Sequence, residues 1–284
     1  MKKWYLFLFL ILTILTPRGL AFAATVGNPL DLDLPPRSAV LREDAVNRAL
    51  DDSEQMFKIK AAVDLEFLFS KDLDTASEVD GAEIKGQYLM VKLGVDIFNR
   101  FEPYVKIGLS DLEAKWRQND QSDIEMDADM ALAWGVGLKG IIYEFENLGL
   151  RITADAQYRI TEPDVGDISL DGRPITDSGP DFKIKEWQAA LVLSKKLELP
   201  LKWQSMYLVT YTGFTVSDST ADLEFVDTQN PGADYSVFDA SNDKIYGFLF
   251  GCDIMPSLTS SFIYNFELRL IDEVALSLGG AVKF

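Results

Sequence analysis

The stretch LRITADAQYRI, residues 150–160, decides the fold class because every second side chain in it is apolar or aromatic. The positions between them carry Arg151, Thr153, Asp155, Gln157 and Arg159. A period of two places these two sets on opposite faces of a β-strand, since successive side chains of a strand point to opposite sides. The stretch therefore predicts a strand with one apolar face and one charged face.

The same alternation recurs on both sides of this stretch. It is clear at residues 58–69 and 261–270, and it predicts ten strands in all. Their approximate ranges are 58–70, 84–98, 102–116, 125–143, 148–161, 182–197, 201–216, 243–255, 258–270 and 273–284. Outer-membrane barrels of bacteria have an even number of strands, and a tilted strand crosses hydrocarbon in roughly 9 to 11 residues. The sequence predicts an all-β fold, a transmembrane antiparallel up-and-down β-barrel of about ten strands over residues 58–284.

The links between the predicted strands alternate in length, as barrels with short periplasmic turns and long external loops require. The short links are residues 99–101, 144–147, 198–200 and 256–257, and the long ones are 71–83, 117–124, 161–181 and 217–242. This order predicts that both termini lie in the periplasm and that the long loops face outward. The link at 271–272 departs from the pattern, because it is short where an external loop is expected. Both sets of alternate residues in 201–216 contain apolar side chains, so the sequence does not decide which set faces inward.

The first residues resemble an export signal rather than a part of the fold. Two lysines precede an apolar run from Trp4 to Leu15, and the sequence AFA at residues 21–23 suits cleavage by a signal peptidase. We expect a signal peptide at residues 1–23, with an uncleaved anchor as the alternative. Residues 24–57 do not alternate and are expected to form a periplasmic N-terminal segment: a short helix or plug, a linker, or a partner-binding arm.

Composition excludes several classes of function. A formal net charge of −18 argues against a nucleic-acid partner. The chain has no histidine, which excludes hydrolytic mechanisms that use a histidine base, and we expect no enzyme activity. A carboxylate pair at Asp127 and Asp129 has the chemistry of a glycosidase, but solvated or salt-bridged acids near the rim are the preferred interpretation. Cys252 shares the parity of aromatic neighbours, which indicates a lipid-facing packing role.

The charged parity of the strands predicts the residues that line the lumen. The candidates are Lys58, Lys60, Asp64, Glu66, Lys92, Asp96, Lys106, Asp127, Asp129, Lys139, Arg151, Asp155, Arg159, Glu267 and Arg269. Two functions fit them: a small porin-like channel for passive diffusion of ions or small solutes, or a structural or adhesin-like surface-interaction barrel whose paired charges close the lumen. A soluble periplasmic barrel or sandwich is a third alternative, against which Trp116, Trp134, Trp187 and Trp203 count because several lie near predicted strand ends.

The predicted external loops are strongly acidic, and residues 217–242 hold six acids and no base. We expect no cofactor. Loosely bound Ca²⁺ or Mg²⁺ that bridges to lipopolysaccharide phosphates is one expectation for these loops, and plain solvation is the alternative because no calcium-loop spacing occurs. Outer-membrane lipid and lipopolysaccharide are the expected partners.

Two short stretches resemble known families. Val274, Leu276, Leu278, Val282 and Phe284 resemble the C-terminal signal of outer-membrane barrels, which implies insertion by the barrel assembly machinery, with Val282 and Phe284 as signal residues. Residues 26–29, VGNP, are similar to the start of the mature chlamydial major outer-membrane protein family, whose members are cysteine-rich porins. This chain has one cysteine and is shorter, so no residue roles are carried over.

Overall fold

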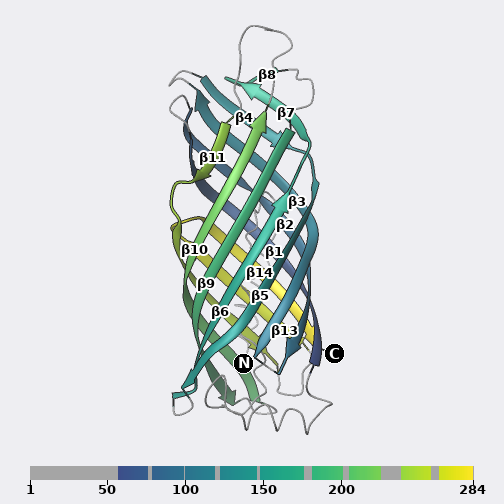
Figure 1. Cartoon of the computed structure of the whole chain (residues 1–284), viewed down its shortest axis with the longest axis vertical. Helices are drawn as coiled ribbons and strands as arrows, with labels where there is room; N and C mark the ends of the chain where they lie inside the picture. Colours follow the sequence, from purple (N-terminus) through teal and green to yellow (C-terminus); the bar gives the residue numbers. More distant parts are fainter. Residues whose placement is uncertain are drawn as a thin grey trace, which may run out of the picture.

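The structure is a computed structural model, and it describes residues 57–75, 79–98, 100–118, 122–145, 148–175, 181–200, 205–224, 238–256 and 262–283. The predicted signal peptide, residues 24–56 of the predicted N-terminal segment, and Phe284 lie outside the described residues. The described residues are nearly all in β-strands (Figure 1). No helix among them is long and apolar enough to cross a membrane.

Ten strands close the barrel. They are β1 (Phe57–Asp74), β2 (Val79–Ile97), β3 (Phe101–Gln118), β5 (Ala131–Phe145), β6 (Leu150–Thr161), β9 (Asp181–Pro200), β10 (Ser205–Glu224), β12 (Tyr246–Met255), β13 (Phe262–Leu270) and β14 (Val274–Lys283). Each pairs antiparallel with the next, and β14 pairs with β1 to complete the ring. The predicted fold class is confirmed, and each predicted segment corresponds to one barrel strand.

Four shorter strands extend the barrel at the end opposite to the start of β1 (Figure 1). They are β4 (Ser122–Ala128), β7 (Val165–Leu170), β8 (Arg173–Ile175) and β11 (Phe238–Asn242). β4, β7 and β8 add in turn to the far half of β3, whereas β11 lies between β10 and β1. We call the end that carries these four strands the upper end. The end where β1 begins is the lower end.

These extensions correct two expectations from the sequence. The predicted strand 125–143 is interrupted at residues 129–130, which separate β4 from β5. The predicted long links are in part strands, because β1 and β10 continue into them and the link 161–181 contains β7 and β8. Acidic composition led to the prediction of loops there, although the alternation of apolar and polar residues continues.

The alternation continues but its two faces exchange character along the barrel. In the lower half of β3 the outward residues are apolar, from Phe101 to Leu109, and Glu102 faces inward. In the upper half the outward residues are charged, as at Glu113, and Leu112 faces inward. The same exchange occurs in β2. An apolar belt therefore surrounds the lower barrel; along β3 it spans about 20 Å, from the rise per residue and the usual tilt.

The short link at residues 271–273 has a structural counterpart on the neighbouring strands. β12, β13 and β14 have 10, 9 and 10 residues, whereas β9 and β10 have 20 each. β11 occupies the wall above this link and pairs with β10 at Ala221 and with β1 at Leu73. The strands β12, β13 and β14 therefore end below their neighbours, and β11 fills the gap above them between β10 and β1.

Candidate functional site

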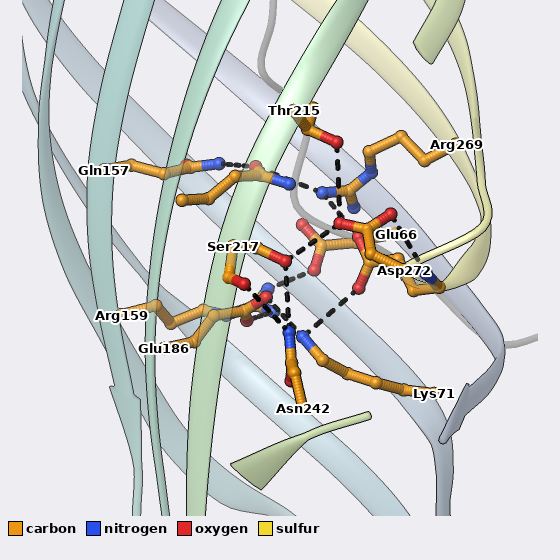
Figure 2. A network of polar contacts seen from close by, with 12 residues as sticks. Glu66, Lys71, Gln157, Arg159, Glu186, Thr215, Ser217, Asn242, Arg269 and Asp272 are labelled. Atoms are coloured by element: carbon orange, nitrogen blue, oxygen red, sulfur yellow. Dashed lines mark hydrogen bonds and ion pairs between the residues drawn. The ribbon is translucent and has the colours of Figure 1, made fainter. Parts of the chain in front are cut away.

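The interior of the barrel consists of two charged layers below one apolar layer, and the central layer holds a network of ion pairs (Figure 2). Arg159 on β6 donates to Glu66 on β1 and to Glu186 on β9. The Lys71 ammonium lies 2.8 Å from Glu186 Oε1 and 3.5 Å from a carboxylate oxygen of Glu273. These side chains are buried, so the network ties opposite walls together inside the lumen.

Arg269 on β13 extends the central layer. Its Nη1 atom lies 2.8 Å from Glu273 Oε1 and 3.3 Å from the amide oxygen of Gln188. The guanidinium of Arg159 also stacks on the ring of Tyr88, with 3.8 Å between its Cζ and the ring centroid. Each arginine thus contacts both charged and neutral partners, which limits its freedom to move aside for a solute.

The link between β13 and β14 folds two acids, Asp272 and Glu273, into the barrel. Asp272 accepts a 2.8 Å hydrogen bond from Ser217 Oγ and lies against Gly247, where a Cβ atom would overlap its carboxylate. Asn242 on β11 donates to the same Ser217 through its side-chain amide. Figure 2 shows these groups meeting beside Lys71. Burial, reinforced by the charge of Glu273, raises the pKa of Asp272 to about 6.

The lower charged layer lies inside the apolar belt. The Glu102 carboxylate holds Lys92 at 2.9 Å and Lys60 at 2.8 Å. The Tyr104 hydroxyl donates to Asp155 over 2.8 Å. Buried charges of opposite sign are thus close together throughout the layer, as ion pairs require when they are removed from water.

Two tyrosine rings fill the space between these charges. Tyr104 lies over Gly137 and Tyr211 over Gly251, each glycine being the direct cross-strand partner, and a Cβ atom at either glycine would overlap the ring. The Tyr211 hydroxyl donates to Glu267 at 3.1 Å. The glycines therefore leave room for the two rings to lie against the neighbouring strands.

The upper layer is a continuous apolar cluster rather than a polar channel. Its buried members are Leu68, Leu73, Ala82, Ile84, Tyr88, Met90, Leu112, Ala114, Trp116, Ile124, Met126, Ala128, Ala133, Ile168, Phe182, Ile184, Ala221, Ala240 and Ala275. They come from both the barrel strands and the extensions β4, β7 and β11. Above the charged layers, the described part of the barrel is therefore packed like a protein core.

The structure places all but two of the predicted lining residues in the interior. The lower layer holds Lys58, Lys60, Asp64, Lys92, Asp96, Lys106, Lys139, Arg151 and Asp155, and the central layer holds Glu66, Arg159, Glu267 and Arg269. Asp127 and Asp129 were expected to line the lumen, and this was wrong because both are exposed on the outer surface. They lie above the apolar belt, on the part of the wall whose outward side chains are polar.

Several residues of the central layer were not predicted as site residues. Lys71 and Asp272 fell in predicted links, where no periodicity marks a residue as inward-facing, and Glu273 was the first residue of the predicted strand 273–284. The one sign in the sequence is the short link at residues 271–272. Its shortness does not show that its acid faces inward. Cys252 is half-buried on the outward parity of β12, the side that the sequence indicated.

Among the described residues, no group of three or more acidic, histidine or cysteine side chains could hold a metal ion. The acidic links at residues 225–237 and 176–180 lie outside that search. Bound Ca²⁺ or Mg²⁺ at the external loops therefore stays a prediction.

No family model and no curated protein matches the chain. The translocator domain of the autotransporter NalP from Neisseria meningitidis is 9% identical with a TM-score of 0.34, covering 84% of this chain and 93% of that one. The outer membrane protein OprG from Pseudomonas aeruginosa is 10% identical with a TM-score of 0.34, covering 80% and 95%. The transport unit of the autotransporter AIDA-I from Escherichia coli is 11% identical with a TM-score of 0.32, covering 84% and 96%.

Similarities of this size say nothing about function. The resemblance of residues 26–29 to the chlamydial major outer-membrane protein gains no support from these comparisons.

Proposed function

We propose that this chain is an outer-membrane β-barrel with a closed lumen, which acts as a structural or surface-interaction protein rather than as a diffusion channel. The belt of exposed apolar side chains supports the membrane location. Val105, Ile107, Leu138 and Leu191 are each about half exposed on the outside of the lower barrel. A soluble protein rarely exposes so many apolar side chains together, whereas a barrel in lipid requires them. The predicted signal peptide is consistent with this location.

The stacking of the three interior layers is the observation that carries the closed lumen. A solute that enters from below meets buried ion pairs, then the network around Arg159, and then the apolar layer that contains Leu112 and Met126. Removing one partner of a buried ion pair costs about 3–5 kcal/mol, so parting these layers is expensive. Among the members of the apolar layer only Tyr88 and Trp116 carry side-chain hydrogen-bonding groups, so the layer offers little to replace the water of a hydrated ion.

The long strands suit a protein that exposes a binding surface outside the membrane. β3 and β10 continue above the belt by about eight residues, roughly 20 Å along a tilted strand. The acids Glu113, Asp127 and Asp167 lie side by side on neighbouring strands of this outer wall. This wall would hold the external links well clear of the lipid. A packed core inside the upper end makes that platform rigid.

A porin-like channel remains the second candidate, because the lower layer is charged and both signs are present. Solute flux into liposomes separates the two functions. The mature chain is refolded in detergent, checked for a heat-dependent shift on gels and reconstituted in liposomes. A closed barrel leaves the swelling rate in a small sugar equal to that of empty liposomes, whereas faster swelling favours the porin. Recovery of folded protein without detergent would contradict the membrane location.

A further inference from the structure

The strand β11 is weakly attached to the rest of the barrel wall. It pairs with β10 over three residues and with β1 over two, whereas β9 and β10 pair along the full 20 residues of each strand. The described side chains that β11 turns inward are those of Ala240 and Asn242, a methyl group and an amide. Closing the wall with β11 therefore buries little apolar area and forms few backbone hydrogen bonds, as is typical of segments that open locally.

A chain of hydrogen bonds leads from β11 to the link between β13 and β14. Asn242 Nδ2 lies 3.1 Å from Ser217 Oγ on β10, and Ser217 Oγ lies 2.8 Å from Asp272 Oδ2. An amide N–H donates and a carboxylate oxygen accepts, so the Ser217 hydroxyl accepts from Asn242 and donates to Asp272. Figure 2 shows the three side chains together. The position of β11 is therefore coupled to the Asp272 carboxyl group.

The closed position of β11 also keeps water away from Asp272. This side chain is 2% exposed, and it lies in the link directly below the gap that β11 fills. The charged groups that face it are Glu273 in the same link, Arg269 on β13 and Lys71 on β1. Among the described residues, its contacts on β10 and β12 are uncharged. Removal of β11 would open this cluster to water from the side.

Hydration changes the affinity of Asp272 for a proton. Burial and the charge of Glu273 raise the pKa of Asp272 to about 6 in the closed wall. Contact with water would return this pKa toward its ordinary value of about 3.9. Opening of β11 therefore releases a proton, and a step that releases a proton becomes more favourable as the pH rises.

We propose that β11 is a latch of the upper wall: a proton on Asp272 stabilises its closed position, and ionisation of Asp272 favours its release. Release would expose the edges of β10 and β1 and the central layer of ion pairs. The opening would lie at the upper rim of the apolar belt, where Tyr246 and Ile271 are exposed. The lower charged layer lies below this opening, so the latch neither requires a closed lumen nor creates a channel.

Amide hydrogen exchange of the full mature chain, folded in neutral detergent, measures the opening. Protection factors, which remove the intrinsic pH dependence of exchange, are compared at pH 5 and pH 7 for residues 238–245 and for β12. We expect β11 to be less protected than β12 at both pH values, and about tenfold less protected at pH 7 than at pH 5. Protection of β11 equal to that of β12, or independent of pH, would overturn the latch.

Two substitutions locate the proton. Asp272→Asn keeps a neutral side chain of similar shape, so the protection of β11 should be equal at pH 5 and pH 7. Asp222→Asn is the matched control, because Asp222 pairs with β11 across the strands but its side chain points outward toward Lys185. This control should keep the tenfold change. A change that survives Asp272→Asn would show that the proton binds elsewhere and would contradict the proposal.

A disulfide tests whether β11 itself moves. Ala221 and Ala240 are direct cross-strand partners, so A221C/A240C in a Cys252→Ser background places two thiols where they can bridge β10 and β11. Oxidation should abolish the pH dependence and reduction should restore it in the same protein, which separates the latch from a folding defect. The same pH dependence in the oxidised and reduced chains would refute the latch. Channel current from this protein would contradict the closed lumen but would leave the exchange result unchanged.

Discussion

Tyr211 lies flat against Gly251, its direct partner across β10 and β12, and its hydroxyl reaches Glu267 on the next strand at 3.1 Å. A side chain at Gly251 would take the place of the ring. Tyr104 and Gly137 repeat this arrangement between β3 and β5. The interior thus depends on pairs of one very large and one very small residue, which is how a narrow barrel is filled without gaps.

Gly251→Ala should therefore lower the free energy of unfolding by about 1–3 kcal/mol, the usual cost of overpacking. Urea unfolding in detergent, followed by the gel shift or by fluorescence, measures the loss. Gly280→Ala is the matched control, since a Cβ atom there meets nothing within 4 Å. Equal effects at both positions would show that the ring does not depend on the glycine.

Arg159 holds two acids, Glu66 and Glu186, that are otherwise buried among apolar groups and other ion pairs. Arg159→Met should cost about 3–5 kcal/mol of stability because it removes the ion-pair partner of buried Glu66 and one of the two partners of Glu186, whose other partner is Lys71. The triple variant R159M/E66Q/E186Q should recover part of that loss. Lys183→Met, which breaks an exposed pair with Glu162, should leave stability unchanged. An unchanged midpoint for Arg159→Met would mean that the central layer is hydrated.

The pKa of Asp272, raised to about 6, predicts a pH dependence of stability. The fold favours the neutral acid, so this group stabilises the fold most below its unfolded pKa of about 3.9. Its contribution then decreases as the pH rises through the folded pKa, because the unfolded chain ionises first. Unfolding midpoints measured between pH 4 and 7 should show this decrease. The charged groups that face Asp272 are Glu273, Arg269 and Lys71. Asp272→Asn should flatten that part of the profile, and an identical slope would contradict the assignment.

The exchange of faces along β3 predicts where lipid ends. Val105 is 50% exposed on the belt, and Glu113 lies on the same outward face of the strand above it. Val105→Arg should destabilise the barrel by about 2–4 kcal/mol in phospholipid vesicles, because an arginine on the lipid face near the midplane is costly. Glu113→Arg should change stability little. Equal tolerance at the two positions would remove the physical basis for the membrane location.

Much of the fold follows from local pattern. The alternation in residues 150–160 is sufficient to predict β6, because each residue there faces either the outer apolar belt or the charged interior. The same rule fails at Asp127, since it holds only along the apolar belt. Above the belt the outward side chains are polar and the inward ones apolar, and no single position in the sequence marks the height at which this exchange occurs.

The central layer depends on contacts that no local pattern carries. Lys71 faces inward because the β1 register shifts between Leu68 and Ser70, and a bulge of this kind leaves no periodic sign. Asp272 turns inward toward Ser217 on β10, and Glu273 turns inward toward Lys71 on β1; both partners lie far away along the chain. Pairing of such residues is a tertiary property, which the composition of a link cannot reveal.

Single-channel recording across a planar bilayer tests the closed lumen most directly. The mature protein is refolded, its gel shift is verified, and the current is recorded at moderate voltage in potassium chloride. The layered interior predicts no steady steps, with a baseline equal to that of detergent alone. Steady, cation-selective steps from the same folded preparation would contradict the closed lumen and would establish a diffusion channel.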